Sequence, residues 1–248
     1  MKHSNKEKTY IIGDIHGEYK TLLALITKLP QEAKLIFVGD LIDRGPQSKE
    51  VIAFVKERKA PCMLGNHEWM MLEYGRLFLD EYPHNSAESL DTMWLKHGGI
   101  ETLISYGLLQ ESTWLKKWSI IHDKDKIAAF QADILWLDTL AYYHRFQGVK
   151  KEGKEIVISH ASISDFWHLH NAPNEEHVLH EAALWNRNIP TQSTSIYNIH
   201  GHTPITEIAC DTHSLNIDTG CYMREKGYGR LSAYCVEDES IISIDRVS

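Results

Sequence analysis

Short hydrophobic runs in this chain end directly in glycine followed by Asp or Asn. Thr9–Ile12 is a β-prone run that leads into Gly13-Asp14, and residues 34–38 lead into Gly39-Asp40 in the same way. Each run is followed by a stretch with hydrophobic residues at helical spacing, such as residues 19–29. This alternation predicts an α/β fold whose polar side chains gather at the carboxyl ends of parallel strands.

The polar segments supply carboxylate and amide oxygens and imidazole nitrogens, and no cysteine takes part. They are Gly13-Asp14-Ile15-His16-Gly17, Gly39-Asp40-Leu41-Ile42-Asp43-Arg44-Gly45, Gly65-Asn66-His67-Glu68, Ser159-His160-Ala161, Leu184-Trp185-Asn186-Arg187 and Gly201-His202-Thr203-Pro204. Such donors suit Mn, Fe or Zn better than Ca or a thiolate-held structural zinc. The set predicts a two-metal site of the kind that hydrolyses phosphoesters.

Each segment taken alone also has an ordinary explanation. Asp14 and His16 point the same way in an extended segment, yet Gly-Asp at a strand end is also a common turn or helix cap. Asp40 and Asp43 could form a solvated acidic turn, and Asn66 could cap the next helix. The histidines of the later segments are two among 15. The order of the segments, most of them after a strand-like run, favours the metal-binding interpretation.

Composition agrees with one large soluble domain spanning residues 1–248. The chain is 43% hydrophobic and 24% charged, and no run approaches the roughly 18 apolar residues that a spanning helix needs. Its net charge of −8 argues against nucleic-acid binding, where a basic face is usual. We therefore expect a cytoplasmic protein without membrane or nucleic-acid partners. The four cysteines lack C-x-x-C spacing, so we expect reduced thiols.

The middle of the chain differs from its flanks. Residues 77–146 hold most of the tryptophans and few strand signals, which predicts a helical insertion within the same domain. The insertion's Trp94, Trp114, Trp118 and Trp136 either pack in the core or supply a stacking wall for a base. Later strand-like runs predict a second, largely antiparallel sheet. These runs are residues 156–159, 196–200, 214–218, 230–236 and 241–244.

The motifs together resemble a known family. Gly-Asp-x-His-Gly, Gly-Asp-x-x-Asp-Arg-Gly and Gly-Asn-His-Glu, followed by two separated histidines, resemble the phosphoprotein phosphatases among the calcineurin-like metallophosphoesterases. Trp185-Asn186-Arg187, Gly201-His202-Thr203-Pro204 and Asp218-Thr219-Gly220 are similar to the bacterial and bacteriophage-lambda type of serine/threonine phosphatase. This resemblance implies an α/β fold of two packed β-sheets flanked by helices, the metallophosphoesterase sandwich.

The resemblance also implies a role for each residue of the site. Two divalent ions, Mn²⁺ first with Fe or Zn as alternatives, would share a nucleophilic water or hydroxide. Asp14 and His16 would hold the first ion, Asp40 would bridge both, and the second would bind Asn66, His160 and His202. His67 would be the general acid, oriented by Asp43, while Arg44, Arg187 and Asn66 would bind the phosphate. Many relatives in the wider superfamily carry Gly-His-x-His, but Pro204 stands at the second histidine, and His200 is a poor substitute.

Three functional classes follow from these observations. The first is a phosphomonoesterase acting on phosphoserine or phosphothreonine of a protein or peptide, with weaker action on phosphotyrosine. The second is a hydrolase of dinucleoside polyphosphates such as diadenosine tetraphosphate, which would need an adenine pocket that the sequence does not identify. The third is a non-catalytic binding module, which would tolerate loss of ligands or of His67. The chain shows no such loss. The first class is preferred, with the second as its alternative.

Overall fold

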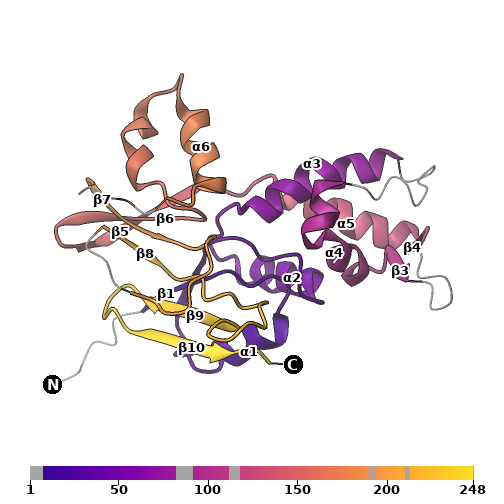
Figure 1. The fold of residues 1–248 in the computed structure, drawn as a ribbon, viewed down its shortest axis with the longest axis horizontal. Coiled ribbons are helices and arrows are strands. Elements are labelled where there is room, and N and C mark those ends of the chain that lie inside the picture. Colours follow the sequence, from indigo (N-terminus) through magenta and orange to yellow (C-terminus); the bar gives the residue numbers. More distant parts are fainter. Residues whose placement is uncertain are drawn as a thin grey trace.

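Two four-stranded sheets packed face to face form the centre of the protein (Figure 1). The computed structural model describes residues 8–81, 92–111, 118–188, 190, 194–209 and 213–247. Between the sheets lies an apolar layer that includes Ile11, Val38, Ile158 and Ile199, all without solvent exposure. The expected α/β sandwich of two sheets flanked by helices is confirmed.

The first sheet has the strand order β10-β9-β1-β2. Its strands are β1 (Thr9–Ile12), β2 (Lys34–Phe37), β9 (Arg230–Cys235) and β10 (Ile241–Asp245). β1 pairs parallel with β2 and antiparallel with β9, which in turn pairs antiparallel with β10. Because β1 is covered on both faces, Ile11 packs between the sheets and Ile12 packs toward the helices.

The second sheet has the strand order β5-β6-β7-β8. Its strands are β5 (Tyr143–Lys151), β6 (Lys154–Ser159), β7 (Ile196–His200) and β8 (Ser214–Asn216). The prediction that this sheet is largely antiparallel was wrong, because β6, β7 and β8 run parallel and only β5 is antiparallel. The prediction also placed β9 and β10 here, whereas they extend the first sheet. Strand periodicity shows which side chains are buried, but not which partner a strand takes.

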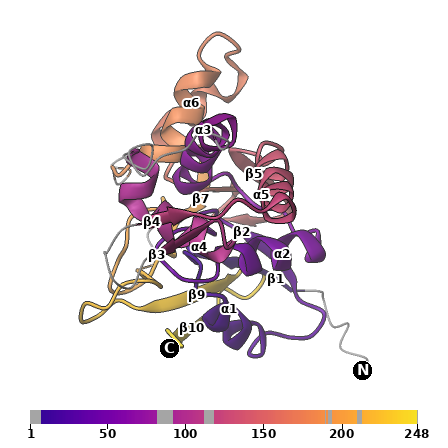
Figure 2. The ribbon, with the colours of Figure 1, turned by 90° about the vertical axis from the view of Figure 1, so that its right-hand side faces the viewer.

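Helices cover the outer faces of both sheets. α1 (Tyr19–Ile26) and α2 (Ser48–Arg58) lie against the first sheet. A 3-10 helix, η3 (Ser164–Asn171), and α6 (Glu176–Trp185) cover the second. Figure 2 shows α6 and α1 at opposite ends of the molecule.

The insertion forms a bundle to one side of the sandwich, and its buried residues join the hydrophobic core of the first sheet (Figure 1). It contains α3 (Asn66–Glu81), a π-helical turn η2 (Leu95–Gly99), α4 (Ile100–Ser105), β3 (Leu109–Glu111), β4 (Trp118–Ile120) and α5 (Lys124–Leu137). This bundle differs in three ways from the expected helical insertion over residues 77–146. α3 begins before the predicted range, at Asn66; β3 and β4 form an antiparallel hairpin; and β5 begins inside the predicted range, at Tyr143.

The tryptophans of the insertion pack in different ways. Trp94 is fully buried in the hydrophobic core, whereas Trp118 and Trp136 are half-buried against that core. Trp114 lies outside the described residues. The core-packing interpretation is therefore confirmed for Trp94, whose ring stacks on Phe130, which in turn packs edge-on against Tyr106.

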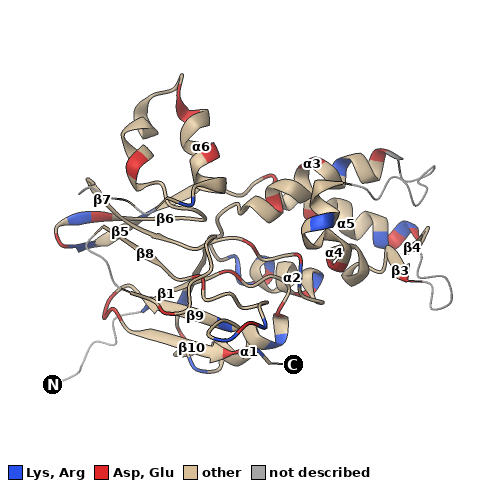
Figure 3. Ribbon diagram, in the orientation of Figure 1, with Lys and Arg blue, Asp and Glu red and all other residues tan. Residues whose placement is uncertain are grey.

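The described part of the chain can be compared with the expectations for cysteines, membrane-spanning helices and charge. Cys62, Cys221 and Cys235 are free thiols, and Cys210 lies outside the described residues. Within the described ranges, no helix combines the length and the apolar character that crossing a bilayer requires. Figure 3 shows basic and acidic residues interspersed over the ribbon rather than separated into blocks.

Candidate metal centre

The predicted site residues lie in loops that follow parallel strands. Asp14 and His16 follow β1, Asp40 follows β2, His160 follows β6 and His202 follows β7. Asn66 begins α3, after a bridge that pairs Phe37 with Cys62 beside β2. Because the carboxyl ends of parallel strands open on one edge, segments far apart in the sequence meet there. All six of these side chains are buried.

The loops of the site adopt backbone conformations that non-glycine residues rarely take. Left-handed φ angles occur at His16 (49°), Asp40 (48°), Asp43 (71°), Arg44 (68°) and His202 (71°). Among the described residues, only three other non-glycine positions share this conformation. Such strain persists where the surrounding structure over-determines it, and it concentrates at functional sites. The folded protein therefore holds these side chains in place against a local preference.

One group of donors surrounds Asn66. Its Oδ1 lies 2.9 Å from His160 Nε2 and 3.0 Å from His202 Nδ1, and the two nitrogens are 3.0 Å apart. Asp40 Oδ1 is 3.4 Å from His160 Nε2. Asp40, His160 and His202 form a group of buried side chains able to hold one cation. These residues are the set expected at the second ion.

A second group lies on the other side of Asp40. His16 Nε2 is 3.4 Å from Asp40 Oδ2, and His16, Asp40 and His67 bring one donor atom each within 4.8 Å of one another. His16 Nδ1 donates to the carbonyl of Ile42 at 2.9 Å, so Nε2 is the nitrogen with the lone pair; it accepts from Arg44 Nη1 at 3.1 Å, a hydrogen bond that an ion bound at Nε2 would replace. Asp40 thus contributes to both groups, as a bridging carboxylate would.

Asp14 lies beside these groups but belongs to neither. Its Oδ2 accepts from the backbone N–H of His202 at 3.1 Å, while Oδ1 is buried without a hydrogen-bond partner. Burial, followed by the negative charges of Asp218 and Asp40, raises the pKa of Asp14 well above its ordinary value. A cation beside Oδ1 would satisfy this atom and relieve the repulsion. The chain therefore fits a divalent ion here, with Asp14 as an additional ligand.

Two glycines from other segments, Gly201 and Gly65, lie against the side chains of Asp14 and Asp40. A Cβ on Gly201 would collide with Oδ1 of Asp14, and a Cβ on Gly65 would collide with Oδ1 of Asp40. The Gly-His and Gly-Asn pairs of the sequence motifs therefore let the backbone approach the carboxylates closely.

His67 and Asp43 form a buried pair at the edge of the centre. His67 Nδ1 donates to Asp43 Oδ2 at 2.7 Å, and His67 Nε2 lies 4.0 Å from Asp40 Oδ2. Burial by itself lowers the pKa of His67, but the Asp40 and Asp43 carboxylates outweigh it and raise the pKa above its ordinary value. The imidazole can thus carry a proton and present it at Nε2.

The two predicted arginines act on different residues of the donor groups. Arg44 Nη1 donates to His16 Nε2 at 3.1 Å, and its guanidinium lies 4.2 Å from the ring centroid of Tyr222. Arg187 is exposed, and its charge adds to burial in lowering the pKa of His160 and His202. Arg44 thus contacts His16, while the charge of Arg187 acts on His160 and His202.

Other residues of the centre were not identified as functional from the sequence. Glu68 accepts from the backbone N–H groups of Asp40 and Gly65 through Oε2 and of Leu41 and Ile42 through Oε1, at 2.8–3.3 Å. This buried carboxylate holds the loop of the bridging residue. The only sequence signal was its place in the Gly-Asn-His-Glu motif.

Tyr222, Trp94 and Thr102 also contact site residues. The Tyr222 ring packs edge-on against His16 with centroids 4.8 Å apart. Trp94 and Thr102 hydrogen-bond to Asp43. Nothing in their local sequence indicates these contacts. His200 is buried, with Nδ1 3.2 Å from the Gly201 carbonyl, and it joins neither donor group.

The sequence of this chain is similar to known phosphoesterases. A family model described as "Calcineurin-like phosphoesterase" matches residues 7–214. The symmetrical bis(5'-nucleosyl)-tetraphosphatase of Coxiella burnetii (strain RSA 331 / Henzerling II) is 34% identical over 138 residues, which cover 47% of each chain. The chain thus spans about half the length of that relative.

Two further relatives carry different names. Serine/threonine-protein phosphatase 1 of Salmonella typhimurium is 36% identical over 40% of this chain and 42% of its own. The bis(5'-nucleosyl)-tetraphosphatase PrpE [asymmetrical] of Halalkalibacterium halodurans is 30% identical over 85% of this chain and 84% of its own.

Solved structures share the fold. A putative diadenosine tetraphosphatase superimposes with a TM-score of 0.58 at 18% identity, covering 97% of this chain and 94% of its own. A serine/threonine phosphatase from Saccharomyces cerevisiae gives a TM-score of 0.57 at 14% identity, covering 100% and 82%. Family match, fold and buried donor groups agree, so the chain belongs to the calcineurin-like phosphoesterase family.

Proposed function

We propose that this protein is a metal-dependent phosphomonoesterase that acts on phosphoserine and phosphothreonine in proteins or peptides. The observation that carries the proposal is the buried His67–Asp43 pair, joined at 2.7 Å beside Asp40. A serine or threonine alkoxide is a poor leaving group and needs a proton as its bond to phosphorus breaks. The proposal assigns delivery of that proton to His67 Nε2.

The other residues would bind and orient the phosphate. Asp14, His16, Asp40, Asn66, His160 and His202 would hold two divalent ions, with Mn²⁺ as the first choice. When bound, two such ions supply an activated water and neutralise charge on the phosphate. Arg44 and Arg187 would contact the phosphate oxygens, since a guanidinium fork matches two of them at once.

A dinucleoside polyphosphate hydrolase is the second candidate. It is supported by the names of relatives that match most of the chain, and by a cavity of about 270 Å³ lined by Arg187, His200 and Thr203. A base or sugar could enter this cavity while Arg187 contacts a phosphate. However, the leaving group of such a substrate is itself a phosphate of low pKa, which gains little from a general acid. The His67–Asp43 pair therefore supports the first candidate more directly.

A direct comparison of substrates tests the proposal. With Mn²⁺ supplied, kcat/KM would be measured for phosphoserine, phosphothreonine and phosphotyrosine peptides and for diadenosine tetraphosphate. We expect turnover of the first two peptides, weaker turnover of the third and poor hydrolysis of the dinucleotide. A kcat/KM for diadenosine tetraphosphate well above that for every phosphopeptide would overturn the protein-phosphatase assignment and leave the metal centre intact.

A further inference from the structure

We propose that the insertion positions the general acid through two residues, Trp94 and Thr102, that fix the orientation of the Asp43 carboxylate. The inference rests on the proposed role of His67 in protonating the leaving group. Trp94 and Thr102 are the first and last residues of a segment that we call the bracing segment (residues 94–102), which includes η2 and the start of α4. The hydrogen bonds that their side chains make to the site go to Asp43, which belongs to neither donor group, so we describe them as positioning residues.

Both oxygens of Asp43 are occupied by donors from the bracing segment. Trp94 Nε1 donates to Oδ1 at 3.1 Å and to Oδ2 at 3.0 Å, and Thr102 Oγ1 donates to Oδ1 at 2.6 Å. His67 Nδ1 then donates to Oδ2 at 2.7 Å. Because Trp94 bridges the two oxygens and Thr102 holds one of them, the carboxylate cannot rotate away from His67 without losing hydrogen bonds.

The surroundings of this network exclude water. Asp43 and Thr102 are 0% exposed, and Trp94 and His67 are 1% exposed. A buried carboxylate that lost a donor could not recover the hydrogen bond from solvent. The orientation of Asp43, and through it that of the His67 ring, therefore depends on the bracing segment.

The backbone of the bracing segment also contacts the loop that carries Asp43 and Arg44. The Gly98 carbonyl accepts from the Arg44 N–H at 3.2 Å, and Gly98 has a φ of 112°. A Cβ on Gly98 would lie 2.6 Å from Arg44 N, and a Cβ on Gly99 would lie 2.6 Å from the Trp94 indole. The two glycines thus let the segment reach Arg44 on one side and admit the indole on the other.

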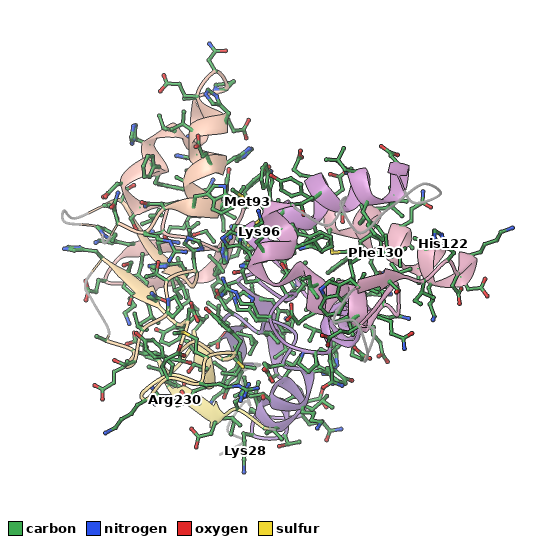
Figure 4. All side chains as sticks on the ribbon, turned by 45° about the vertical axis from the view of Figure 1, so that its right-hand side comes forward. Lys28, Met93, Lys96, His122, Phe130 and Arg230 are labelled. Atoms are coloured by element: carbon green, nitrogen blue, oxygen red, sulfur yellow. The ribbon has the colours of Figure 1, made fainter. Side chains whose placement is uncertain are left out.

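The interior of the insertion holds Trp94 in place. Its ring stacks on Phe130 of α5 with centroids 6.3 Å apart, and Phe130 packs edge-on against Tyr106 at 5.1 Å. Figure 4 shows Phe130 inside the insertion. The Trp94 indole N–H therefore connects the aromatic packing of the insertion to Asp43, and Asp43 in turn holds the proposed general acid His67.

The test compares two aryl phosphates that differ in their need for a proton. Phenyl phosphate has a poor leaving group and p-nitrophenyl phosphate has a good one. In full-length enzyme supplied with Mn²⁺, we expect Thr102→Val and Trp94→Phe to lower kcat for phenyl phosphate by about 10–100-fold, the usual range for residues that orient a site side chain. The loss with p-nitrophenyl phosphate should be below about threefold, because its leaving group needs little proton donation.

The ratio of the two kcat values on one preparation does not depend on how much enzyme is folded. It therefore remains interpretable even if a variant is partly unfolded. Thr102→Ser, which keeps the hydroxyl, should restore the parent ratio. Thr139→Val and Trp136→Phe are matched controls, because these residues lie in or directly after α5 and donate nothing to Asp43, and they should leave the ratio unchanged.

A double variant separates this inference from the proposed function. In a His67→Asn background, Thr102→Val should cause almost no further change in the ratio, because the positioned acid is already gone. Two results would overturn the positioning role while His67 keeps its own leaving-group dependence. In the first, the change in the kcat ratio of the double variant is the product of the changes in the two single variants. In the second, Thr102→Val lowers kcat equally with both substrates. If His67→Asn itself shows no such dependence, the general-acid role fails and the bracing proposal fails with it.

Discussion

His160 Nε2 lies 3.0 Å from His202 Nδ1, and Asn66 Oδ1 lies within 3.0 Å of both atoms. Hydrogen bonds alone cannot satisfy all three of these atoms. The Asn66 oxygen can only accept, and two neutral imidazoles offer too few N–H groups for every contact of the triangle. A cation at the centre would satisfy all three atoms at once, with Asp40 Oδ1 as a fourth donor 3.4 Å from His160 Nε2. Metal binding is therefore expected to stabilise the fold as well as the activity.

We expect chelation to abolish hydrolysis of p-nitrophenyl phosphate and Mn²⁺ to restore it. Mn²⁺ at 100 times its Kd should add about 2.7 kcal/mol to the free energy of unfolding and raise the Tm by about 5–10 °C. Differential scanning calorimetry with and without chelator measures this shift. Asp40→Asn should remove most of the shift and of the activity, since Asp40 contributes to both groups. Full activity in metal-free enzyme would contradict the two-metal centre.

His67→Asn should lower kcat for phenyl phosphate by about 10²–10⁴-fold, because the leaving group then departs without a proton. The loss should be much smaller for p-nitrophenyl phosphate. Arg44→Ala is the comparison variant, because loss of a phosphate contact should reduce kcat/KM for both substrates alike. Steady-state kinetics over a range of substrate concentrations, which give kcat and kcat/KM separately, measure the difference. Equal losses for the two substrates in His67→Asn would count against the acid.

Gly201→Ala should weaken metal binding, because its Cβ would collide with Oδ1 of Asp14. The carboxylate must then rotate away from the position in which it faces an ion. Titration of apoprotein with Mn²⁺, followed by calorimetry, should show at least about a tenfold weaker site. Gly153→Ala is the control, because no atom lies within 4 Å of its Cβ and only its positive φ is strained. The control should lose stability with unchanged metal affinity.

His200 should make stability depend on pH. Burial lowers the pKa of His200 from 6.5 to about 4, so below pH 6.5 the unfolded chain binds a proton that the folded chain does not. The stability it contributes is present above pH 6.5 and is lost as pH falls toward 4. Between pH 7 and 5 the loss should be about 2 kcal/mol, at about 1.4 kcal/mol per pH unit.

Urea unfolding of chelated protein, compared with His200→Gln, isolates this contribution from that of the ligand histidines. The difference in unfolding free energy between the two proteins should shrink as pH falls. A difference that stays constant between pH 7 and 5 would show that His200 titrates normally in the folded protein.

The amino-acid sequence by itself determined the parts of the protein that depend on local pattern. The buried run Thr9–Ile12, the Gly-Asp turn after it and the following amphipathic stretch predicted a strand, a loop and a helix, and the structure has all three. The candidate donor residues could be proposed because their residue types and spacing recur after strand-like runs. Their convergence followed from the general geometry of parallel strands.

The tertiary structure decided what depends on contacts between distant residues. Tyr10 pairs with Cys235 in β9, and no local signal distinguishes this partner from one in the second sheet, so β9 and β10 were assigned to the wrong sheet. Trp94 and Thr102 reach Asp43 from 51 and 59 residues away. Periodicity records that a side chain is buried, but hydrogen-bond geometry between separate segments exists only once the chain has packed.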